Sequence, residues 1–286
     1  MAQSDLHPRR HVFHGHASGV SAHFRRPETK LLPVQGSVSL PVTGGLAESN
    51  LKAADDPRLE EFKKWISFDS VSTSAHGDYV DAGQGVATTR GEVAFDAAPT
   101  VTRVKASVKD LVILGRVKVA HAAMGLTSHS AVGREQPLIR PEGNILDGVS
   151  IDGHRLAITL AEDLYRDCDT KDKLAKRHAG LSPRQKRMFL PAASGVDEAT
   201  EFPDANGTVK CSIVQEIRWD GPAHPTATIH DHVVHVPDFG KIYFGEMFIK
   251  GSSRRLTMVR FQLGSPDGGE VAAAEGESNG DPWPPG

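Results

Sequence analysis

The sequence predicts an all-β protein, an antiparallel β-sandwich or barrel-like fold with one short helical excursion, and three observations support this class. Apolar and polar residues alternate with a period of two in most of the chain, which indicates strands with one buried and one solvated face. Glycine and proline are plentiful, at 28 and 18 of 286 residues, as expected where many short strands are joined by turns. Helical periodicity is scarce, so a helical bundle is not predicted.

The clearest strand lies near the middle of the chain, in the segment VTRVKASVKDLVILGRVKVAHAAMGL. One face is predicted to carry Thr102, Val104, Ala106 and Val108, and the other Arg103, Lys105, Ser107 and Lys109. A mainly apolar run follows. Gly115 then predicts a bulge or bend, after which Val117 and Val119 resume the alternation.

Further strands are predicted wherever the same pattern recurs, to a total of about nine to twelve. The segments are GSVSLPV, WISFDSVSTS, EVAFDA, VSIDGHRLAITLAEDLY, VKCSIVQEIRW, ATIHDHVVHV, GKIYFGEMFIKG and RRLTMVRFQL. The pair Asp152-Gly153 predicts a type I′ hairpin turn, because both residue types tolerate a positive φ. Flanking lysines on GKIYFGEMFIKG suggest a guarded strand at a sheet edge.

Two places favour helix. Asp56 before Pro57 is typical of a helix start, because the carboxylate accepts from free N–H groups and proline suits the first position. Thr170 can cap a second helix within a predicted helical insertion near residues 169–190. The basic residues of this insertion are interrupted by acids and no aromatic residues alternate with them. We therefore favour a solvated helical hairpin there over a contact with a polyanion.

We expect one β-rich domain, residues 11–264, between two disordered tails. Residues 1–10 are polar and contain Pro8. Residues 265–286 are rich in glycine, proline and acids, a composition that buries little apolar surface.

Charge and composition exclude several classes of protein. Thirty-three Lys and Arg against thirty-six Asp and Glu give 33 − 36 = −3, so no nucleic-acid partner is expected. No apolar run reaches the roughly 20 residues of a membrane helix, and the first residues lack the apolar core of a signal peptide. Cys168 and Cys211 permit one disulfide without requiring it, and free thiols are favoured.

Histidines in i, i+2 pairs raise the possibility of a metal site. His14 and His16 form one pair, and His230 and His232 another. Neighbouring strands could join them into a four-histidine site for a transition metal such as Zn. Against this, Val236 and Pro237 stand where a cupin-like site would carry an acid, and the chain has 14 histidines. Surface or structural histidines, with no cofactor, are therefore the favoured interpretation.

Other chemical motifs are weaker. GESNG at residues 276–280 matches the nucleophile pattern G-x-S-x-G, but without the strand-to-helix context that the pattern requires. Glu216, Asp220 and Glu246 could pair as glycosidase carboxylates only if the fold brought them together. No catalytic residue is therefore predicted.

Six segments follow one another along the chain: HASGVSAHF, SVSLPVTGG, ISFDSVSTSAHG, VKASVKDLVILGRVKVAHAAMGLTS, GVSIDG and HDHVVHVPDFGKIYFGEMFIKGSS. In their order the chain resembles the secreted bacterial proteins of the choice-of-anchor P family. The resemblance implies a β-rich exported domain at or beyond the cell surface, with no established enzymatic role. This chain departs from the family in showing no signal sequence and in carrying more charge, so a cytoplasmic location stays open.

The sequence therefore predicts a non-enzymatic β-rich structural or surface-displayed protein, which acts by self-association or by binding a surface partner. The alternative is a metal-binding protein or metal-dependent β-sandwich enzyme that uses His14, His16, His230 and His232.

Overall fold

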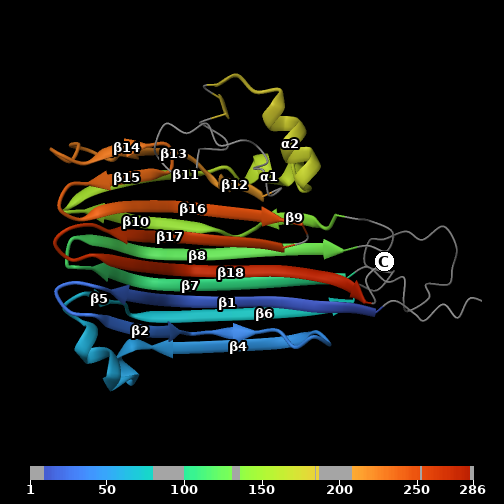
Figure 1. Ribbon diagram of the computed structural model, residues 1–286, viewed down its shortest axis with the longest axis horizontal. Coiled ribbons are helices and arrows are strands. Elements are labelled where there is room, and N and C mark those ends of the chain that lie inside the picture. Colours follow the sequence, from blue (N-terminus) through green and yellow to red (C-terminus); the bar gives the residue numbers. More distant parts are fainter. Residues whose placement is uncertain are drawn as a thin grey trace, which may run out of the picture.

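The computed structural model describes residues 10–79, 100–130, 136–183, 185–186, 208–251 and 253–283. Two large antiparallel sheets pack against each other, with a pair of short helices at one margin (Figure 1). The predicted all-β fold is confirmed. In the described ranges, no helix combines the length and apolar character needed to cross a bilayer.

The first sheet has nine strands. Its main path is β14 (Thr228–His230), β15 (Val233–Val236), β16 (Gly240–Lys250), β17 (Ser253–Leu263), β18 (Gly269–Trp283), β1 (Arg10–Phe24) and β2 (Lys30–Gln35). Off this path, β12 (Thr208–Ser212) pairs with β16 and β3 (Val38–Ser39) pairs with β1.

The second sheet also has nine strands. Its main path is β13 (Val214–Trp219), β11 (His154–Leu160), β10 (Ile145–Ile151), β8 (Val117–Ser130), β7 (Thr100–Ile113), β6 (Ser70–Tyr79) and β4 (Gly45–Lys52). Off this path, β5 (Ile66–Ser67) pairs with β7 and β9 (Leu138–Pro141) pairs with β8.

The core lies between the sheets and follows the predicted alternation. On β7, Val104, Ala106 and Val108 are buried, whereas Arg103 and Lys105 are exposed. Phe13 and Phe24 on β1 and Phe244 and Phe261 in β16 and β17 are also buried. Each buried large apolar side chain contributes about 2 kcal/mol to folding.

Pairing in the second sheet is interrupted at one level. Asp110 of β7 and Gly148 of β10 both have positive φ, 53° and 61°, and neither is paired with Ala120 of β8, although the register is the same on both sides of the gap. Gly115, where a bend was predicted, instead lies in the tight turn that reverses the chain from β7 to β8, with φ 67°. The irregularity in β7 therefore lies at Asp110, five residues before the glycine that predicted it.

The prediction of a disordered C-terminal tail at residues 265–286 is wrong for the described part of it. β18 pairs with β17 on one side and β1 on the other, in the interior of the first sheet. Val271 and Ala273 are buried, and Glu275 on the outer face contacts Arg255 and Thr257 of β17. The acidic and small residues of this segment resemble a solvated tail when the sequence is considered alone, but here they form a strand that is paired on both sides.

The helical insertion begins earlier than predicted. β11 ends at Leu160, and α1 (Glu162–Asp167) follows where a continuing strand was expected, with Tyr165 buried. Thr170 caps α2 (Lys171–Ala179) through a bond from the Lys173 N–H, as predicted. Residues 187–190 of the expected insertion lie outside the described residues.

The predicted helix after Asp56 is confirmed in position, although its turns are 3-10. The segments are η1 (Ala53–Asp55) and η2 (Pro57–Phe62), and the Asp56 carboxylate accepts from the Arg58 N–H. Leu59 and Phe62 are buried against the sandwich.

Candidate functional site

The structure does not bring the four predicted metal-binding histidines together. His14 and His16 project from β1 with ring centroids 6.0 Å apart, whereas His230 ends β14. β15, β16, β17 and β18 lie between those strands, so the two pairs are separated by roughly 24 Å, at about 4.8 Å per strand spacing. Metal ligands must all lie about 2 Å from one ion. Within the described ranges, no group of three or more His, Cys, Asp or Glu could hold a metal.

The alternation predicted that His230 and His232 lie on the same strand face, but in the structure they do not. The chain reverses at Asp231, whose φ is 52°, and His230 pairs with Val233 across the turn. His230 is therefore exposed while His232 is fully buried. The turn between the two residues ends the strand, so the rule that residues i and i+2 share a face does not apply to them.

His232 instead lies beside a buried ion pair. The Arg260 guanidinium donates to Glu246 at 2.6 and 3.0 Å and stacks on the Tyr243 ring at 3.8 Å. The Glu246 carboxylate is 3.9 Å from His232 Nε2, beyond hydrogen-bond length, so Arg260 is its direct partner. Burial raises the pKa of Glu246, but His232 and Arg260 outweigh it and hold that pKa below its ordinary value.

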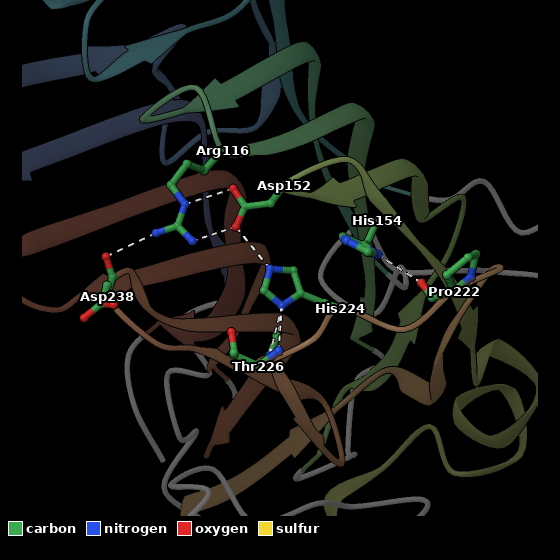
Figure 2. A network of polar contacts seen from close by, with 8 residues as sticks. Arg116, Asp152, His154, Pro222, His224, Thr226 and Asp238 are labelled. Carbon is green, nitrogen blue, oxygen red and sulfur yellow. Dashed lines mark hydrogen bonds and ion pairs between the residues drawn. The ribbon is translucent and has the colours of Figure 1, made fainter.

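A second polar network joins turns at one end of the sandwich (Figure 2). Arg116, in the β7–β8 turn, donates to both carboxylate oxygens of Asp152 at 2.9 and 2.6 Å and to the Asp238 carbonyl at 3.2 Å. His224 Nε2 lies 3.2 Å from Asp152. Hydrogen bonds from Arg116 hold the pKa of Asp152 below its ordinary value, with a smaller contribution from His224.

His224 cannot act as a general base in this arrangement. Its Nδ1 accepts from the N–H groups of Thr226 and Ala227 at 3.2 and 3.0 Å, so the proton of the neutral ring is on Nε2, which donates to Asp152. Both nitrogens are thus engaged. The network connects the hairpin turns to the segment that joins β13 to β14, and it resembles a structural brace more than a catalytic dyad.

Sequence reasoning missed this network because its members come from separate turns. Asp152 was recognised only as a turn residue, and His154 and His224 belong to no pair pattern. His154 Nδ1 lies 3.0 Å from the Pro222 carbonyl, and its ring meets His224 edge to face at 5.1 Å. Only the fold places these rings together.

The weaker catalytic candidates are not assembled either. Glu216 lies on β13 in the second sheet, whereas Glu246 lies on β16 in the first and is committed to Arg260. Ser278 is fully buried within β18, and β18 continues through the GESNG segment without the turn that the nucleophile pattern needs.

Both cysteines are free and buried. Burial raises the pKa of Cys211 to about 12, so this thiol is protonated at neutral pH. Burial also raises the pKa of Cys168. Neither thiol is a reactive nucleophile in the folded protein.

One lateral edge of the sandwich exposes apolar side chains. We call the β2–β4 edge the surface formed by strand β4 together with Leu31, Val34 and Val42, on or between β2 and β4. Leu31, Val34, Val42 and Leu46 are 67%, 49%, 65% and 61% exposed. In the described ranges the one other exposed large apolar side chain is Ile145, at 39%. Figure 1 shows β2 and β4 at the same margin, each at the end of its sheet.

β4 offers unpaired main-chain groups along this edge. In the described ranges it pairs with β6 alone. The Ala53 N–H donates to the Asp69 carbonyl at 2.8 Å, directly across the continued ladder. In an antiparallel pair, every second residue of a strand forms hydrogen bonds with the neighbouring strand, and the residues between them direct their N–H and C=O groups away from it. Since Ala53 bonds to Asp69, the even-numbered residues Leu46, Glu48, Asn50 and Lys52 direct these groups away from β6. The side chains of the same four residues are exposed.

The sequence did not predict β4, and it misplaced the edge. The segment GLAESNLK is made largely of helix-favouring residues, so only its pairing with β6 makes it a strand. The segment GKIYFGEMFIKG, predicted to be an edge, contains β16, which lies between β17 on one side and β15 and β12 on the other. Its lysines therefore guard no open edge.

Comparisons with known proteins provide a family and no function. The family described as Domain of unknown function (DUF8256) matches residues 11–250. No curated protein and no solved structure matches the chain.

Proposed function

The chain belongs to the DUF8256 family, a domain family of unknown function, and on that premise we propose a function from the geometry. We propose that it is a non-enzymatic, β-rich structural protein that acts by association through the β2–β4 edge, including association with copies of itself. The observation that carries this proposal is that β4 pairs with β6 alone in the described ranges, and that apolar side chains, Val42 and Leu46, are exposed at one end of its free edge.

The chemistry of the edge supports association. Natural proteins protect edge strands with charge, proline or bulges, because unpaired N–H and C=O groups template pairing with another chain. Pro33 provides such protection on β2. β4 has eight residues, no proline, and one charge of each sign.

The polar clusters support a non-enzymatic role. In the Figure 2 network both His224 nitrogens are engaged, and the Asp152 carboxylate is held by Arg116. Glu246 is likewise occupied by Arg260. These groups stabilise turns and strands, and neither cluster holds a free acid–base pair.

The setting that we propose for this association is outside the cell or at its surface. The resemblance of the ordered segments to secreted bacterial surface proteins supports it. Protease treatment of intact cells checks it, because a displayed protein is digested and one inside the cell is protected.

Sedimentation of the purified protein tests the association. We expect the wild-type chain to form assemblies as its concentration rises, and the double variant Val42→Asp/Leu46→Asp to remain monomeric. Both positions are more than 60% exposed, so the substitutions leave the core intact. Ile145→Asp, on β10, is the matched control, because it adds a charge at an exposed apolar position away from the edge.

Two results would overturn the proposal. One is a wild-type protein that stays monomeric across the whole concentration range. The other is an assembly that the edge variant leaves intact, whether or not Ile145→Asp dissolves it.

A further inference from the structure

We infer that the partner at this edge is a second copy of the chain, and that the two β4 strands pair antiparallel about a two-fold axis at Asn50. The inference depends on the proposed function, because it takes the β2–β4 edge as the association site. It adds the identity of the partner and the register of the contact.

The main chain of β4 allows this pairing. Leu46, Glu48, Asn50 and Lys52 direct their hydrogen-bonding groups outward. A two-fold axis through Asn50 places Asn50 opposite Asn50, and Glu48 opposite Lys52, of the second copy. Donors then face acceptors along the strand, and the second sheets of the two copies become continuous.

Charge selects the register. With the axis at Asn50, Glu48 of each copy lies opposite Lys52 of the other, which gives two opposite-charge pairs across the interface. An axis at Glu48 or at Lys52 would place like charges opposite each other, and an axis at Ser49 would pair Glu48 with Asn50. Within the described part of the chain, neither Glu48 nor Lys52 has an ion-pair partner of its own.

The same register gives Leu46 a place to pack. It carries Leu46 of each copy past the end of the other copy's β4, to the level of Ala54 in η1. Ala54 lines a cavity of about 400 Å³ with Ala53, Pro57 and Leu59 among its other walls. An exposed leucine and a cavity with apolar walls on one side are thus brought close to each other across the two-fold axis.

Charge exchange tests the register directly. Glu48→Lys and Lys52→Glu, each made alone, convert both cross-strand pairs to like charges, and each is expected to weaken the homodimer about tenfold or more. The two single variants mixed together restore both opposite-charge pairs and should form a heterodimer. The double variant Glu48→Lys/Lys52→Glu should recover the homodimer. Sedimentation gives the dissociation constants, and Lys105→Glu, an exposed charge change on β7, is the control.

The outcomes separate the two proposals. If the edge variant Val42→Asp/Leu46→Asp dissolves the assembly but mixing the single variants restores nothing, the register is wrong and the association edge stands. If neither the edge variant nor the charge variants change the assembly, both proposals fail. Thermal unfolding checks that each variant is folded. We expect this because all substituted side chains are solvent-exposed.

Discussion

Arg260 holds the carboxylate of Glu246 with two hydrogen bonds, of 2.6 and 3.0 Å, at a position where Glu246 is only 2% exposed. Tyr243, the cross-strand neighbour of Arg260, packs under its guanidinium. A buried carboxylate is tolerated in the sheet because this one arginine both neutralises it and satisfies its oxygens.

Arg260→Met should therefore destabilise the protein strongly. The substitution keeps much of the side-chain volume but leaves Glu246 buried without its charged partner, a loss of about 3 kcal/mol. Urea unfolding measures it. Arg255→Met is the matched control, because the Arg255–Glu275 pair is more exposed and should contribute about 0.5 kcal/mol. Equal losses for the two variants would contradict this account.

Acid should destabilise the wild-type protein through Glu246 and Asp152. Both have folded pKa values below their ordinary values of 4.5 and 3.8, so their ion pairs stabilise the fold above those values. That stability is lost as the pH falls through the lowered folded pKa values. In Glu246→Gln, the dependence of the unfolding free energy on pH should be shallower in this range. An unchanged slope would show that Glu246 does not contribute.

His224→Phe should loosen the turn segment without unfolding the sandwich. The ring keeps its packing on Trp219, but the N–H groups of Thr226 and Ala227 and the carboxylate of Asp152 lose their partner. We expect faster amide exchange at residues 220–227 and a loss of about 1 to 2 kcal/mol. His154→Phe removes one bond only and should have a smaller effect. Unaltered exchange at these residues would show that the network is not a brace.

Truncation before β18 should abolish folding. Removing residues 269–286 deletes a strand between β17 and β1, and it exposes a face of the core that includes Phe13 and Phe261. Circular dichroism and solubility of the shortened chain check this. A soluble, β-rich truncated protein would show that residues 269–286 are a dispensable tail after all.

Protein purified without a tag should contain no stoichiometric transition metal. His14 and His230 are on strands separated by four others, so neither pair can complete the other's coordination. Elemental analysis of the wild type and of His230→Ala tests the expectation. One Zn, Cu, Fe or Ni per chain, lost in the variant, would revive the metal-binding alternative.

The sequence by itself determined the fold class. Side chains on a strand alternate between two faces, so a period of two in residues such as Val104 to Val108 is a local property that needs no knowledge of neighbours. The same local logic located the Asp152-Gly153 turn and the caps at Asp56 and Thr170. Each depends on residues a few positions apart.

Only the tertiary structure decided which strands lie beside each other, and every candidate site depends on that order. It separated His14 from His230, assembled Arg116, Asp152 and His224 from separate turns, and placed β18 inside the first sheet. Among the described residues it also placed β4 at the end of the second sheet, paired with β6 alone. Hydrogen bonds between strands join residues distant in the chain, and the energy that selects one order comes from packing the two sheets together, which no local pattern records.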